Sequence, residues 1–119
     1  MFCKVIVSVP INKEYTYRYS KNLILNRGDV VKVPWTGDAE SFAEVCSAVP
    51  IPVLIAGGSR GTSFTELLRI VEQSISAGGA GVCMGRQVFG ADDPASHIQA
   101  LKAVIHEGKT ATEAAEHLG

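Results

Sequence analysis

Two short runs of apolar residues, at 53–56 and 82–84, most constrain what this chain can fold into. Each run is too short for a buried helix and is flanked by glycine or proline, so both are typical of strands. Between them, residues 64–75 carry apolar side chains at helical spacing. Strands that are apolar on both faces occur in parallel sheets covered by helices. From about residue 38 onward the sequence therefore predicts alternating βα units, a fold of the α/β class.

Capping residues predict where the helices begin. Ser63 and Thr110 each begin a capping-box pattern, with a glutamate three residues later. Asp38 precedes another amphipathic segment, and Asp93 is followed by a proline, which suits the first turn of a helix. Gly108 is expected to end the helix that Asp93 begins. The core face expected for that helix consists of Ile98, Leu101, Val104 and Ile105.

The first part of the chain, residues 1–29, has a different pattern. Residues 4–9 are rich in β-branched side chains, 15–19 alternate with period two, and 29–33 form another apolar run. Turn-forming residues lie between these segments. We therefore expect a short antiparallel β segment there, and we divide the chain into a β-rich part at 1–29 and an α/β part at 30–119.

Composition excludes some classes of protein. The chain has 119 residues, 46% of them hydrophobic, which suffices for the modest core of one soluble domain. A net charge of −1 provides no basic field for non-specific nucleic-acid binding, and no apolar run approaches the roughly 20 residues of a membrane span. Cys3, Cys46 and Cys83 match neither a disulfide framework nor a metal-ligand pattern. We expect a cytoplasmic protein with reduced thiols, no metal and no membrane partner.

Two glycine-bearing turns follow the two apolar strands. The first contains Ala56, Gly57 and Gly58, and the second contains Gly85 and Arg86. In parallel α/β sheets, such turns meet at the edge where active sites lie. Glycines let backbone N–H groups approach a phosphate, a helix start adds a favourable dipole, and arginine adds a charge-assisted bond. The turns indicate a phosphate site. The alternative is that the glycines only reverse the chain and that the arginine is solvated.

Lys32 interrupts the apolar stretch 30–35. Apolar surroundings disfavour the charged form of a lysine, and a neutral amine can attack a ketone to form an iminium. Lys32 is therefore a candidate nucleophile. The alternative is an edge-strand lysine that discourages aggregation.

Several stretches of the chain, in unbroken order, resemble one enzyme family. They are 31–38, 52–58, 77–89 and 92–94. The resemblance is to the DhnA-type class I fructose-bisphosphate aldolases, a family that also includes archaeal-type aldolases and aminodeoxyheptulosonate synthases. It implies part of a (β/α)8 TIM barrel, about its last three βα units. It further implies that Lys32 forms a Schiff base with a phosphorylated sugar, that the two glycine turns hold the substrate phosphate, and that no cofactor takes part.

The same resemblance leaves part of the enzyme without a counterpart. The earlier strands of the family, with the aspartate and tyrosine that transfer protons, are not matched in this sequence. A whole barrel needs about 250 residues. We therefore expect a fragment or fusion that is incomplete as a catalyst alone, with open strand edges that invite pairing into a homo-oligomer.

The N-terminal residues carry a second resemblance. Residues 7–11, 15–17 and 28–35 resemble the opening of the replication-restart helicase PriA. This implies that Tyr15, Thr16 and Tyr17 recognise the 3′ end of a DNA strand, with rings that stack on a base. The alternative is that these tyrosines pack on one face of the β segment. The two resemblances overlap at residues 28–35. A third hypothesis is therefore that the chain is a non-functional chimera joined at this shared segment.

Overall fold

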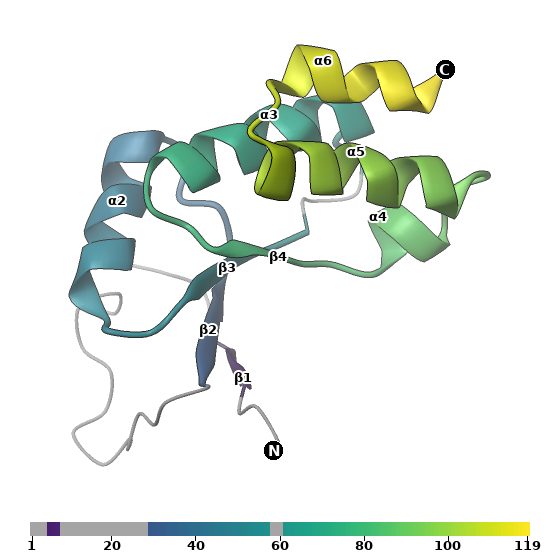
Figure 1. The fold of residues 1–119 in the computed structure, drawn as a ribbon. Coiled ribbons are helices and arrows are strands. Elements are labelled where there is room, and N and C mark those ends of the chain that lie inside the picture. Colours follow the sequence, from purple (N-terminus) through teal and green to yellow (C-terminus); the bar gives the residue numbers. More distant parts are fainter. Residues whose placement is uncertain (1–4, 8–28, 58–60) are drawn as a thin grey trace.

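The computed structural model describes residues 5–7, 29–57 and 61–119. Its helices lie above a small sheet, and the N-terminal strand lies at the far edge of that sheet (Figure 1). The elements are β1 (Val5–Val7), β2 (Val30–Val33), α2 (Ala39–Ala48), β3 (Val53–Ala56), α3 (Phe64–Ser76), β4 (Gly81–Cys83), α4 (Arg86–Phe89), α5 (Pro94–Glu107), α6 (Ala111–Ala115) and a final 3-10 turn, η1 (Glu116–Leu118).

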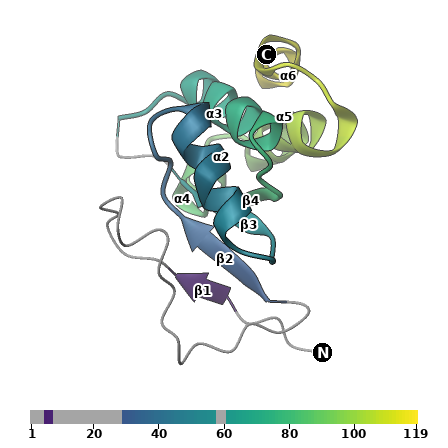
Figure 2. The same cartoon turned by 90° about the vertical axis from the view of Figure 1, so that its left-hand side faces the viewer.

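The four described strands form one parallel sheet in the order β1-β2-β3-β4. Lys32 pairs with Leu54, and Leu54 pairs in turn with Gly81. Helices α2, α3 and α5 all lie on one side of this sheet (Figures 1 and 2). The α/β class predicted from the alternation of strands and helices is therefore confirmed. Because the strands are parallel, their carboxyl ends all lie at the same edge of the sheet.

The antiparallel β segment expected at the N-terminus is not shown by the strands that can be compared, which pair in parallel. Val5 pairs with Val30 and Val7 with Lys32, in parallel. The prediction assumed tight turns between successive strands. The chain from residue 8 to residue 28 is longer than the crossover of about a dozen residues that parallel pairing requires, so parallel pairing is open to it. The expected strand at 15–19 lies outside the described residues.

The predicted caps are present. Asp38, Ser63, Asp93 and Thr110 each accept a hydrogen bond from the backbone N–H three residues later, at 2.7, 3.2, 3.3 and 3.2 Å. At Thr110 the box is complete, because a glutamate carboxylate accepts from the Thr110 N–H at 2.8 Å. At Ser63 only the first half forms, since the carboxylate of Glu66 contacts Arg69 at 3.3 Å instead. Local sequence therefore determines where these helices begin.

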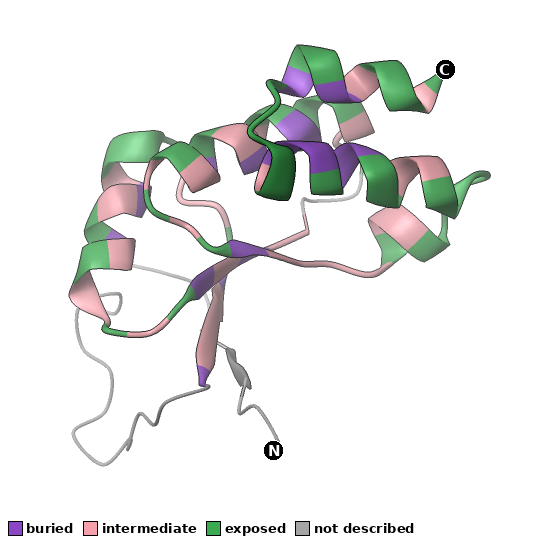
Figure 3. Cartoon of the chain, in the orientation of Figure 1, coloured by how far each residue is buried: buried purple, intermediate pink, exposed green. Residues whose placement is uncertain are grey.

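The core lies between the sheet and the helices (Figure 3). Val33 and Ile55 point from the sheet towards Phe42 of α2 and Leu68 of α3, and all four side chains are buried. Helices α3, α5 and α6 also pack against one another. Most of the buried residues that α5 and α6 contribute are small, namely Ala100, Ala103, Val104, Ala111 and Ala114.

One predicted core residue is not in the core. Ile98 is 54% exposed, whereas Leu101 and Val104 of the same helix are buried. The buried set of α5 is centred on Ala100, Leu101, Ala103 and Val104. At 100° per residue, Ile98 lies about 140° around the helix from the middle of that set. Phe89 of α4 is also exposed, at 72%. In the segments that the structure describes, no helix is long and apolar enough to cross a membrane.

Candidate functional site

Lys32 lies on the face of the sheet opposite the helices. Val31 and Val33 flank it in β2, and Val33 is buried in the core with 3% exposure. Because side chains alternate along a strand, Lys32 must point to the other face, which it shares with Leu54. Both side chains are half-buried. No described helix covers this face. In a closed (β/α)8 barrel, the face opposite the helices is the interior.

Lys32 is one step below the carboxyl edge of the sheet. It pairs with Leu54, and Ala56, the last residue of β3, lies two residues further along the strand. At the rise of a parallel strand this step is about 6–7 Å. The four-carbon stem of a lysine can span much of that distance. The amine can therefore reach the edge at which the glycine turns begin.

The two glycine turns follow neighbouring strands, and a side chain of α4 packs against the first of them. Ala56 pairs with Cys83, so Gly57 and Gly85 follow adjacent strands. A Cβ placed on Gly57 would lie 2.5 Å from Oε1 and 2.7 Å from Nε2 of Gln87 in α4. The carboxamide of Gln87 therefore rests directly on the Gly57 backbone. The structure brings the two predicted turns together, as expected for consecutive parallel strands.

Arg86 is the first residue of α4 and is exposed. The helix has only four residues, and it is capped by Gly85 without a side-chain hydrogen bond. A helix this short contributes little dipole, because the macrodipole depends on aligned peptide units. Any strong attraction for an anion at this turn must therefore come from the Arg86 guanidinium itself.

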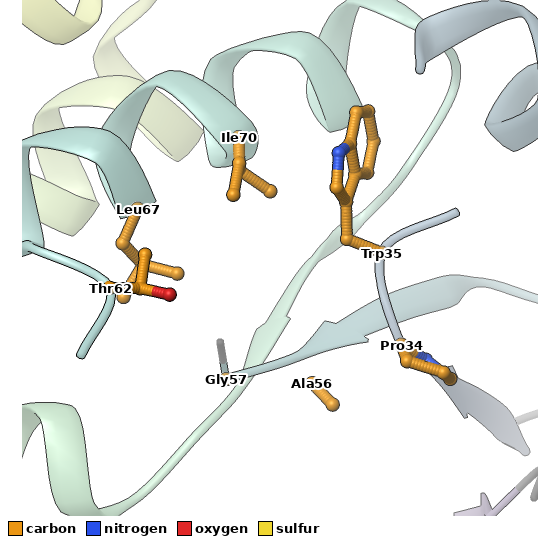
Figure 4. A pocket seen from close by; sticks show the side chains of 7 residues that line it. All are labelled: Pro34, Trp35, Ala56, Gly57, Thr62, Leu67 and Ile70. Atoms are coloured by element: carbon orange, nitrogen blue, oxygen red, sulfur yellow. The ribbon is translucent and has the colours of Figure 1, made fainter. Parts of the chain in front are cut away.

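A pocket of about 230 Å³ opens between the carboxyl ends of β2 and β3 and the start of α3 (Figure 4). Its lining residues are Pro34, Trp35, Ala56, Gly57, Thr62, Leu67 and Ile70. The Trp35 ring also packs on Phe42, with centroids 5.2 Å apart. Ala56 and Gly57 belong to the predicted phosphate turns, but Lys32 and Arg86 do not line this pocket. The pocket is smaller than the roughly 300–1,000 Å³ typical of ligand sites.

Some predicted site residues lie outside the described part of the chain. Gly58 is one, and Tyr15, Thr16 and Tyr17 of the DNA-binding alternative are the others. Sequence reasoning missed one described residue, Gln87. Apart from its position beside Arg86, nothing in the sequence indicates that its side chain packs on the turn after β3. Contacts between turns of different strands follow from the packing of the sheet rather than from local pattern.

Parallel strands whose helices cover one face are the arrangement found in a sector of a (β/α)8 barrel. The structure is similar to the crystal structure of an archaeal fructose 1,6-bisphosphate aldolase, with a TM-score of 0.62 and 30% sequence identity over 66% of this chain and 32% of that one. The fold is thus of the α/β class with parallel strands, and the solved structure that it resembles is a TIM-barrel aldolase. The chain belongs to the DeoC/LacD family of aldolases, whose model matches residues 11–91.

Curated relatives agree with this family. The chain is 37% identical, over 113 residues, to 2-amino-3,7-dideoxy-D-threo-hept-6-ulosonate synthase 1 of Archaeoglobus fulgidus, covering 94% of this chain and 42% of that protein. It is 38% identical, over 82 residues, to 2-amino-4,5-dihydroxy-6-oxo-7-(phosphonooxy)heptanoate synthase of Streptomyces griseus, covering 69% of this chain and 30% of that protein. The chain therefore spans less than half the length of these relatives. The family match begins at residue 11 and so includes the tyrosine segment that resembles PriA.

Proposed function

We propose that this chain is the lysine-bearing part of a Schiff-base aldolase, a lyase that acts on phosphorylated ketoses. The observation that carries the proposal is the position of Lys32. It stands on the helix-free face of a parallel sheet, one step below the edge where two glycine turns follow adjacent strands, in a chain of an aldolase family. Both the nucleophile and the anion site of such an enzyme would lie at this edge.

Lys32 would supply the covalent chemistry. Its neutral amine attacks the ketone carbon of the substrate, and the carbinolamine formed loses water to give an iminium. The iminium then accepts the electron pair of the bond between the α and β carbons as that bond breaks, while the β-hydroxyl gives its proton to a general base. This leaves an enamine on Lys32 and releases an aldehyde. Leu54 faces the same side in the neighbouring strand and provides an apolar neighbour for the Lys32 side chain.

The glycine turns would hold the substrate phosphate. Backbone N–H groups of Gly57 and Gly58 after β3, and of Gly85 after β4, can approach phosphate oxygens closely because these residues have no side chain. Arg86 would add a charge-assisted hydrogen bond. Ala56 ends β3 on the same face as Lys32. It would therefore lie between the Lys32 amine and the bound phosphate and determine the distance between them.

Catalysis needs more strands than the described sheet provides. The sheet has four parallel strands, and the barrel of the family class has eight. Carbon–carbon cleavage also needs a general acid and base within hydrogen-bond reach of the substrate. We propose that the additional strands supply these groups. A second copy of the chain is one source of strands, since two four-stranded sheets make eight.

Reductive trapping tests the proposal. Incubation with dihydroxyacetone phosphate and borohydride, followed by peptide mass spectrometry, should give a saturable adduct on Lys32 that inorganic phosphate competes away. Lys102 and Lys109, both exposed, serve as internal controls. Equal labelling of all three lysines would contradict the proposal. A Lys32→Arg variant, which keeps the charge but cannot form the imine under these conditions, should lose the adduct.

A further inference from the structure

We propose that Gln87 is a positioning residue of the phosphate site, whose carboxamide sets the spacing between the turn after β3 and the turn after β4. The inference rests on the function proposed above and deepens it. It starts from a contact between residues that follow different strands. The side chain of Gln87, in α4, rests on the backbone of Gly57, the residue after β3.

The contact is made by the flat face of the carboxamide. A Cβ placed on Gly57 would lie 2.5 Å from Oε1, 2.7 Å from Nε2 and 2.8 Å from Cδ of Gln87. Three atoms at nearly equal distance mean that the amide group covers the position where a side chain of residue 57 would stand. Real Cβ atoms are not found this close to other heavy atoms, so any larger residue at 57 displaces Gln87.

Backbone conformation does not explain why residue 57 is a glycine. The glycines with positive φ among the described residues are Gly37, Gly61, Gly78, Gly81, Gly108 and Gly119, and Gly57 is not among them. The φ of Gly57 therefore lies outside the left-handed region that favours glycine. An alanine at this position would instead displace the end of the Gln87 side chain, which occupies the space of its Cβ.

Gln87 is itself held in place. Its helical turn is tied to Gly85, whose carbonyl accepts from the N–H groups of Val88 at 2.8 Å and Phe89 at 3.0 Å. The side chain of Gln87 is half-buried. A carboxamide held between Gly57 and the turn at Gly85 keeps the N–H groups of these two glycines at one separation. In sites of this kind, a shift of about 1 Å costs up to 100-fold in efficiency.

The test combines a double-mutant cycle with two labelling reagents. The experiment compares wild type with Gly57→Ala, Gln87→Ala and the double variant. The control is Gln99→Ala, which removes an exposed glutamine of α5. Each full-length chain is titrated with dihydroxyacetone phosphate and with dihydroxyacetone under borohydride, and Lys32 labelling is measured. Thermal unfolding of each variant is recorded in parallel.

We expect Gln87→Ala to raise the half-saturating concentration of dihydroxyacetone phosphate by about 10- to 100-fold and to leave that of dihydroxyacetone unchanged. Gly57→Ala should raise the half-saturating concentration of dihydroxyacetone phosphate in wild type but much less in the Gln87→Ala background, where there is no carboxamide to displace. Gln99→Ala should match wild type in every measurement.

Other results overturn the proposal in distinguishable ways. If wild type labels Lys32 equally well with both reagents, the phosphate site of the proposed function is wrong, and the role of Gln87 falls with it. If wild type prefers the phosphorylated reagent and Gln87→Ala keeps that preference, the phosphate site stands and Gln87 does not position it. If Gly57→Ala is equally harmful in both backgrounds, the two residues are not interlocked.

Discussion

The carboxylate of Glu72, on α3, accepts a hydrogen bond of 3.0 Å from the backbone N–H of Ala111, the first residue of α6. The two residues are 39 positions apart in the chain. The bond satisfies an N–H group that has no partner within its own helix. It also fixes α6 against α3, where Ala111 and Ala114 are buried. This bond thus adds a polar contact to the apolar packing that holds α6.

Removal of this acceptor should loosen α6. We expect Glu72→Ala to lower the free energy of unfolding by about 1.5–3 kcal/mol, because a hydrogen bond to a charged group is lost at a partly buried N–H. Glu72→Gln should cost less, since its amide oxygen can still accept. Urea unfolding measures the loss, and hydrogen exchange at the Ala111 amide locates it. Gln73→Ala, an exposed neighbour on the same helix, should have little effect. A Glu72→Ala protein as stable as wild type would refute the role of this bond.

Lys32 can be removed with little harm to the fold. Its side chain is half-buried on the helix-free face, so Lys32→Met should change the free energy of unfolding by less than about 1 kcal/mol. The same substitution should abolish trapping of dihydroxyacetone phosphate, because no amine remains to form the imine. Mass spectrometry of the trapped protein and thermal unfolding together check the prediction. Undiminished trapping in a folded Lys32→Met protein would show that another lysine reacts.

Gly79 should not tolerate a side chain. A Cβ there would lie 2.8 Å from the carbonyl oxygen of Ser74 and 3.0 Å from Cε1 of Phe42. The first of these atoms is backbone at the end of α3, and the second belongs to a fully buried ring, so neither can move aside easily. Gly79→Ala should therefore cost about 1–3 kcal/mol by overpacking. Thermal unfolding measures it, with Ala80→Ser at the exposed next position as control. Equal melting temperatures would contradict the prediction.

The start of α6 should respond to acid. Hydrogen bonds from the backbone N–H and the hydroxyl of Thr110 lower the pKa of Glu113 from its ordinary value of 4.5, with a smaller contribution from Lys109. Because the folded pKa is below the unfolded one, the ionised carboxylate stabilises the helix above pH 4.5, and this stabilisation is lost as the pH falls through the lower folded value. Hydrogen exchange of the α6 amides should therefore accelerate below pH 4.5 relative to that of α3. Glu113→Gln should remove most of this acid-dependent change. Persistence of the change in Glu113→Gln would assign it to another group.

Much of the fold could be predicted from the sequence, and the candidate site only in part. Asp38 and Thr110 cap helices as expected, because a cap is an interaction within four residues of chain. The placing of the two glycine turns after adjacent strands followed from the alternation of parallel strands and helices. The contact between Gln87 and Gly57 could not be predicted, because it joins the turns of two different strands.

The amino-acid sequence by itself determined the βα alternation and the helix starts, since these depend on spacing and on short-range hydrogen bonds. Only the tertiary structure decided that β1 pairs with β2 in parallel and that Ile98 is exposed on α5. It also decided that Glu72 holds the start of α6. These features depend on which surfaces meet across long stretches of chain. The packing of the whole domain selects those contacts, and no local pattern encodes them.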